Sequence, residues 1–112
     1  MKISILLPYK ENFSPEYPGA VSLFINDTSK LSRYKKNIKV YGNTEFKKIF
    51  SIKYQNIVLN KKFIGSQSKK YVHKFIDYER KEPSDLIEVH NRPNYLRYLS
   101  ERLNKRNYTL FF

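Results

Sequence analysis

The chain has 112 residues, a length that suits one domain with a buried core but is short for a complete α/β enzyme. It has no cysteine, which excludes disulfides, thiolate metal sites and a cysteine nucleophile and fits a reducing cytoplasm. The net charge is +12, but Lys, Asn, Ile, Tyr and Phe, which AT-rich codons encode, make up almost half of the chain. Genome composition therefore explains most of this basicity, and attraction to phosphates or to a membrane surface is a secondary effect.

The first half of the chain predicts a strand, a loop and a helix, followed by a second strand. Residues 2–7 are almost continuously apolar, as in a strand covered on both faces, and a polar loop extends from 8 to 18. Gly19 then precedes a helix. The positions of its apolar stripe are Val21, Phe24, Ile25, Thr28 and Leu31. Residues 38–41 alternate between apolar and polar before a Gly-Asn turn signal, which indicates the second strand.

The second half continues the alternation of helices and strands. Between residues 44 and 65 the pattern allows a short helix, then a third strand at 56–59. The short helix would use Phe46, Ile49, Phe50 and Ile52. Residues 66–81 carry one apolar stripe and predict a helix, and 86–89 predict a strand. The following helix has its apolar positions at Leu96, Leu99 and Leu103. Another strand begins at 108–112.

This order of elements predicts an α/β protein with a Rossmann-like, doubly wound parallel sheet, because strands alternate with helices long enough for crossover connections. Residues 1–112 would form one such domain. Since the sequence stops in an apolar strand, we infer that the domain is incomplete and is the front portion of a longer protein. No run of eighteen apolar residues occurs, and the apolar start is too short for a signal peptide. We expect a cytoplasmic protein, soluble or peripheral at the inner face of the membrane.

The junction at residues 85–94 is the most informative part of the chain. A branched apolar run indicates a buried strand, and a proline soon afterwards starts a helix. His90, Asn91 and Arg92 fall in the turn between them, at the edge where open α/β sheets bind ligands. We expect their side chains to project from the carboxyl edge toward the positive end of the helix dipole, open to solvent.

The chemistry of this junction has alternatives. The neutral imidazole of His90 could accept a hydroxyl proton near pH 7 or contact a substrate, or it could be a structural histidine with satisfied hydrogen bonds. Glu88 lies on the same side of the strand and could orient the ring or raise its pKa. Arg92 could bind an anionic or hydroxyl-rich ligand through its fork of donors, or form a salt bridge.

Gly19 follows a proline at the start of the predicted first helix, where a missing side chain lets the backbone approach a phosphate. It could also serve only to permit the turn. The chain has neither a dinucleotide fingerprint nor a P-loop, and it has no nucleophile elbow. Its two histidines, His73 and His90, are separated and have no cysteine beside them, so no metal is expected.

These segments resemble the amino-terminal half of family 4 glycosyltransferases of the GT-B type, particularly bacterial enzymes of lipopolysaccharide and other surface-glycan biosynthesis. The resemblance rests on the opening strand at 3–7, on the Pro18-Gly19-Ala20 loop before a helix, and on the stretch from Asp85 to Pro93. It covers essentially the whole chain. It implies two Rossmann-like domains that face each other across a cleft, with this chain as the domain that binds mostly the acceptor.

The resemblance also implies roles for single residues. Gly19 would lie by the donor phosphates, and His90 would contact the transferred sugar or an acceptor hydroxyl. The chain departs from the family in two places, since Ala20 stands where a second glycine is common and Glu88 stands where His-x-His is common. The carboxyl-terminal donor-binding domain lies outside these 112 residues, so the chain should be inactive by itself.

We therefore predict a fragment of a retaining glycosyltransferase that needs no metal or other cofactor and transfers a sugar from a nucleotide sugar to a glycan or lipid-linked acceptor. His90 would be catalytic, Gly19, Asn91 and Arg92 would bind substrate, and Glu88 would support His90. The main alternative is a small basic nucleic-acid-binding module, with ten tyrosines available for stacking. A third is a degenerate Rossmann domain that serves as an assembly surface, which a deeply buried His90 would favour.

Overall fold

A computed structural model describes residues 1–60, 65–103 and 108–111, the last four by their backbone. The elements in chain order are β1 (Ile3–Leu6), α1 (Ala20–Leu31), the 3₁₀ turn η1 (Lys35–Asn37), β2 (Ile38–Gly42), β3 (Tyr54–Asn56), α2 (Gln67–Lys81), β4 (Leu86–His90), α3 (Pro93–Arg102) and β5 (Tyr108–Phe111). Residue 112, where the last predicted strand was expected to end, lies outside the described residues. Among the described residues, no helix is long and apolar enough to cross a membrane.

The five strands form one parallel sheet in the order β3-β2-β1-β4-β5. The central strand β1 pairs with β2 on one side and with β4 on the other, so that Ile5 lies between Val40 and Glu88. The chain winds outward from β1 to β3 and then returns to the other side of β1. This order confirms the predicted Rossmann-like, doubly wound sheet and places its topological switch point between β1 and β4.

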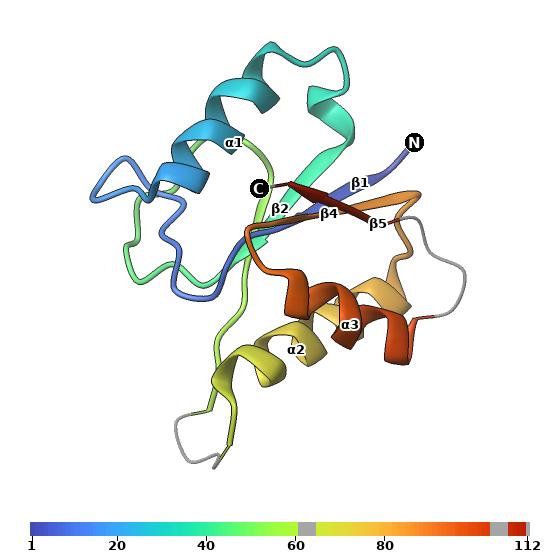
Figure 1. Ribbon diagram of the computed structural model, residues 1–112. Coiled ribbons are helices and arrows are strands. Elements are labelled where there is room, and N and C mark those ends of the chain that lie inside the picture. Colours follow the sequence, from blue (N-terminus) through green and yellow to red (C-terminus); the bar gives the residue numbers. More distant parts are fainter. Residues whose placement is uncertain (61–64, 104–107, 112) are drawn as a thin grey trace.

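Helices cover both faces of the sheet (Figure 1). α1 lies on one face, while α2 and α3 lie together on the other. Alternation along β1 supplies both cores, because Ile5 faces α1 and Leu6 faces α2 and α3. The helix bounds of α2 agree with the prediction, since the Ser66 side chain caps the first turn and Pro83 lies just beyond the last.

Tyr71 of α2 ties this helix to the carboxyl ends of the central strands. Its side chain is fully buried, and its hydroxyl donates to the carbonyl oxygen of Leu7 at 2.7 Å. Burial raises the pKa of Tyr71 well above its usual value, so the hydroxyl remains a donor. The hydrogen bond therefore fixes the position of Leu7, where the loop after β1 begins.

The face that α1 turns to the sheet differs from the predicted one. Its buried residues are Ser22, Ile25, Asn26 and Ser29. Phe24 and Leu31 of the predicted stripe are instead 54% and 88% exposed. Ile25 belongs to both stripes, and Val21 of the predicted stripe is half-buried against the same core. The centre of the buried face is displaced by about one residue position, which is a rotation of about 100°. A hydrogen bond from the Ser22 hydroxyl to the Glu11 carboxylate, at 3.0 Å, holds the observed rotation.

The short helix predicted after β2 does not form. Phe50 packs on the ring of Phe13, and Ile49 and Ile52 pack in the same core from irregular backbone that bends at residues 51 and 52. The Thr44 hydroxyl also accepts a hydrogen bond from the Phe13 amide at 2.9 Å, which holds the start of this segment against the loop after β1. The third strand, β3, begins two residues earlier than predicted and ends at Asn56.

Candidate functional site

The predicted catalytic histidine lies at the last position of β4, at the switch point. Alternation along the strand turns His90 and Glu88 toward the face of the sheet that carries α1. The His90 Nε2 atom lies 3.3 Å from the Glu88 Oε2 atom, so the expected pairing of these two side chains is present.

The imidazole of His90 is nevertheless not open to solvent, as the sequence led us to expect. The residue is only 4% exposed, and the ring of Phe24 from α1 lies against it with 6.2 Å between ring centroids. The Phe24 ring itself is 54% exposed. The rotation of α1 contributes to this difference because it brings Phe24 beside the imidazole, and β5 pairs alongside His90 on the neighbouring strand position.

Asn91 and Arg92 do project into solvent, as predicted. Asn91 has a φ of 54°, which turns the chain from strand to helix within one residue and which asparagine tolerates better than most residues. The Arg92 guanidinium donates to the carbonyl oxygen of Asn91 at 2.7 Å, while the Arg92 carbonyl accepts from the Tyr95 amide at 3.0 Å. These two exposed residues offer a guanidinium and an amide next to the buried imidazole.

Gly19 precedes α1 in ordinary extended backbone, with φ −74°, so the turn itself does not require glycine. A side chain here would displace the Glu11 carboxylate, because a Cβ atom at this position would lie 1.4 Å from the Glu11 Oε2 atom. Gly19 therefore permits a close approach, but the approaching anion is the Glu11 carboxylate of the same chain. That carboxylate bonds to the Ser22 hydroxyl in the first turn, where the helix dipole favours negative charge.

Two hydrogen bonds hold the loop after β1 in place at this edge. The Tyr9 amide donates to the Tyr95 hydroxyl at 3.0 Å, which joins this loop to the first turn of α3. The second hydrogen bond, from the Phe13 amide to the Thr44 hydroxyl, joins the loop to the segment just after β2. The loop and the β4–α3 turn thus lie at the same end of the sheet (Figure 1). Gly19 is connected to His90 indirectly, through α1, whose Phe24 ring lies against the imidazole.

Three contributors to this edge were not assigned from the sequence: Glu11, Phe24 and Tyr95. Phe24 belonged to a predicted apolar stripe, and its helical spacing carried no sign that it would be exposed. Glu11 and Tyr95 act through contacts with residues distant in the sequence, so no local pattern could reveal them. Within the described ranges no three His, Asp or Glu side chains gather as metal ligands do.

The second histidine, His73, lies on α2 and takes no part in this site. Burial lowers its pKa, and the charge of Arg102 adds to this effect. Its Nε2 atom is buried and has no hydrogen-bond partner among the residues that the structure describes. A neutral packing role accounts for both observations.

A double-mutant cycle on Gly19 and Glu11 tests the reason for the glycine. We expect Gly19→Ala to displace the Glu11 carboxylate, with a coupling energy to Glu11→Ala of about 1 kcal/mol in unfolding free energy. The poorer capping by alanine is common to both backgrounds and cancels in the cycle. Urea unfolding of the four variants measures the coupling, and additive losses would mean that Glu11 does not set the requirement.

The arrangement can bind a hydroxyl-rich or anionic ligand at the exposed Asn91 and Arg92. The Glu88-paired imidazole of His90 beside them is buried, with Phe24 on one side and β5 paired alongside the strand, so a ligand meets Asn91 and Arg92 first. Comparisons of the chain with protein-family models, with curated proteins and with solved structures found no match.

Proposed function

We propose that this chain is the acceptor-side domain of a retaining glycosyltransferase of the GT-B type, acting with a nucleotide sugar on a surface-glycan or lipid-linked acceptor. One observation carries the proposal. The parallel sheet brings the His90-Asn91-Arg92 turn and the loop before Gly19 to one edge, on either side of the switch point between β1 and β4. That edge is where ligands of open α/β sheets bind.

In this proposal the exposed residues bind the acceptor, and the buried pair of His90 and Glu88 handles the proton. Asn91 and Arg92 orient the acceptor through hydroxyl or phosphate groups, since both are exposed at the edge. His90 takes the proton of the acceptor hydroxyl while that oxygen bonds to the anomeric carbon on the face from which the nucleoside diphosphate leaves. The bond between sugar and phosphate breaks, the nucleoside diphosphate departs, and the configuration is retained. Glu88 holds the imidazole ring in position. The nucleotide sugar is held by a separate donor-binding domain, so catalysis needs both parts. No step calls for a metal.

The burial of His90 is the observation that favours the alternative of an assembly domain without catalysis. The catalytic role is supported by the contact of His90 with Phe24, because the Phe24 side chain is more than half exposed and can move without unfolding of α1. The nucleic-acid alternative has less support from the structure, because three of the tyrosines are buried and cannot stack on bases: Tyr41, Tyr71 and Tyr95.

Ligand binding to the ¹⁵N-labelled chain tests the proposal. Oligosaccharide acceptors should shift the amide signals of Asn91, Arg92 and the first turn of α1. Arg92→Gln should weaken this binding about tenfold through the loss of a charge-assisted hydrogen bond. Arg33→Gln removes the same charge from another exposed arginine and should leave it unchanged.

The alternatives predict other outcomes in the same titration. Tight binding of oligonucleotides with a steep dependence on salt would favour the nucleic-acid module. The absence of any shift at the carboxyl edge with acceptors and with nucleotide sugars would contradict the glycosyltransferase proposal.

A further inference from the structure

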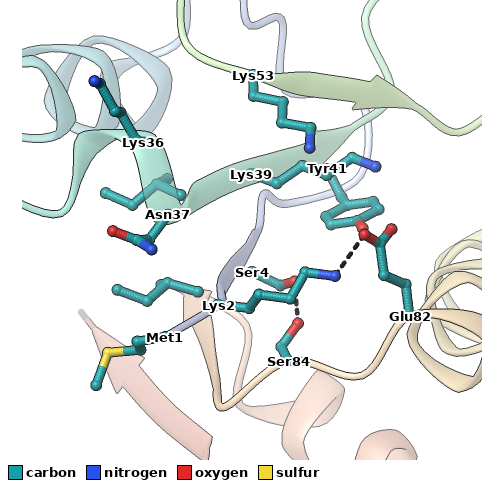
Figure 2. Close-up of a pocket in the computed structure, with 12 residues that line it drawn as sticks. Met1, Lys2, Ser4, Lys36, Asn37, Lys39, Tyr41, Lys53, Glu82 and Ser84 are labelled. Atoms are coloured by element: carbon teal, nitrogen blue, oxygen red, sulfur yellow. Dashed lines mark hydrogen bonds and ion pairs between the residues drawn. The ribbon is translucent and has the colours of Figure 1, made fainter.

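A cavity of about 100 Å³ lies at the opposite edge of the sheet from His90 (Figure 2). Its lining comes from residues at or just before the amino ends of the strands, including Lys2 before β1, Asn37 before β2, Lys53 before β3 and Ser84 before β4. Because parallel strands share their amino ends at one edge, this cavity is separate from the site of the proposed function. Its volume exceeds the roughly 10–15 Å³ that admits one water molecule.

The cavity is strongly basic. Four of its twelve lining residues are lysines, against 16 lysines in the 112-residue chain, so the average composition does not account for it. Figure 2 shows the ammonium group of Lys36 directed away from those of Lys2, Lys39 and Lys53. The Tyr41 ring also lines the cavity, and the Lys39 Nζ atom lies 5.2 Å from its centroid. Glu82 is the one carboxylate in the lining.

The positive charges of these three lysines all favour the ionised form of one carboxyl group, that of Glu82. The Lys2 Nζ atom lies 2.5 Å from a Glu82 carboxylate oxygen, and this hydrogen bond, with the charges of Lys2, Lys39 and Lys53, lowers the pKa of Glu82. Lys39 and Lys53 have no carboxylate within salt-bridge distance in the described part of the chain. The formal charge of the four groups is therefore +2, which a dianion would neutralise.

The polar floor of the cavity is fixed by the protein interior. The Ser84 hydroxyl donates to the buried Glu79 carboxylate at 2.8 Å and is hydrogen bonded to the Ser4 hydroxyl. The proton of the Ser84 hydroxyl is thus directed inward, toward Glu79. An anion in the cavity would be held mainly by the ammonium groups of the lining lysines.

We propose that this cavity binds a phosphate-type dianion, either free phosphate or a phosphomonoester group, between the ammonium groups of Lys2, Lys39 and Lys53. The Glu82 carboxylate competes with the anion, because it forms an ion pair with Lys2 when no ligand is bound. The proposal does not depend on the glycosyltransferase function, and either can fail without the other.

Titration of the ¹⁵N-labelled chain with sodium phosphate, at ionic strength held constant with sodium chloride, tests the site. We expect saturable shifts at the amides of Lys39, Lys53 and Ser84. The double variant Lys39→Gln/Lys53→Gln should bind phosphate at least about tenfold more weakly. The matched control Lys47→Gln/Lys48→Gln removes two exposed lysines outside the cavity and should bind as the parent does.

Glu82→Gln should tighten phosphate binding severalfold, a gain that a misfolded protein could not produce. Equal losses in the two lysine double variants, or no gain in Glu82→Gln, would overturn the site in favour of general charge screening. Cosedimentation with vesicles of phosphatidic acid in phosphatidylcholine distinguishes the sources of the ligand. Binding that needs Lys39 and Lys53 identifies a lipid headgroup, while phosphate binding without cosedimentation identifies a soluble phosphate.

Discussion

Replacement of His90 by alanine should lower kcat by about 10²–10⁴-fold, the range for loss of a positioned general base. The assay needs a protein that joins this chain to a donor-binding domain. The effect follows from the position of the imidazole at the end of β4, paired with Glu88 and next to the exposed turn. Steady-state turnover with a nucleotide sugar and acceptor measures the loss, and circular dichroism shows whether the fold is intact.

Two further variants separate proton transfer from packing. His90→Asn fills part of the same space and should remain as slow as the alanine variant. His73→Ala removes the histidine of α2 and should leave turnover unchanged. Glu88→Gln should keep measurable activity, with a smaller loss of kcat than His90→Ala, because Glu88 acts only by positioning His90. Full turnover in His90→Ala would remove this residue from the mechanism and favour the assembly domain.

Replacement of Glu79 by alanine should lower the unfolding free energy by about 3 kcal/mol, because hydrogen bonds to a buried charged group contribute about 1.5–3 kcal/mol each. The Glu79 carboxylate is fully buried and accepts from both the amide and the hydroxyl of Ser84, at 2.5 and 2.8 Å. The alanine variant leaves both Ser84 donors buried without this acceptor. Urea unfolding of the parent and the variant measures the difference.

Asp77 supplies the matched control, since it is an exposed acid on the same helix. Asp77→Ala should change the unfolding free energy by less than about 0.5 kcal/mol. Glu79→Gln should lie between the two, because its amide keeps one acceptor oxygen. A small effect of Glu79→Ala, comparable with that of Asp77→Ala, would mean that this network does not hold β4 to α2.

Local patterns were sufficient for the elements that start and end at strong signals. α2 is capped by Ser66 and followed by Pro83, and α3 begins at Pro93, so both helices agree with the prediction. The pattern between residues 44 and 65 was weaker. In its first part the chain is irregular, because Ile49, Phe50 and Ile52 reach the core beside Phe13 without forming a helical turn.

The site shows the same division. The order of residues places His90, Asn91 and Arg92 in a turn at the edge of the sheet, because a buried strand that meets a proline-started helix permits little else. Whether the imidazole is covered could not follow from that order. It depends on tertiary contacts of the imidazole, among them the contact with Phe24 of α1 and the pairing of β4 with β5.

The sequence alone determined the class of fold and the edge at which a site would form, since both follow from alternation, capping and proline, which act between near neighbours. The tertiary structure decided the rotation of α1, the partner of Gly19 and the gathering of lysines at the amino edge. Each of these depends on groups that are distant in the chain. Their contacts arise only when the parallel sheet brings the strand ends together.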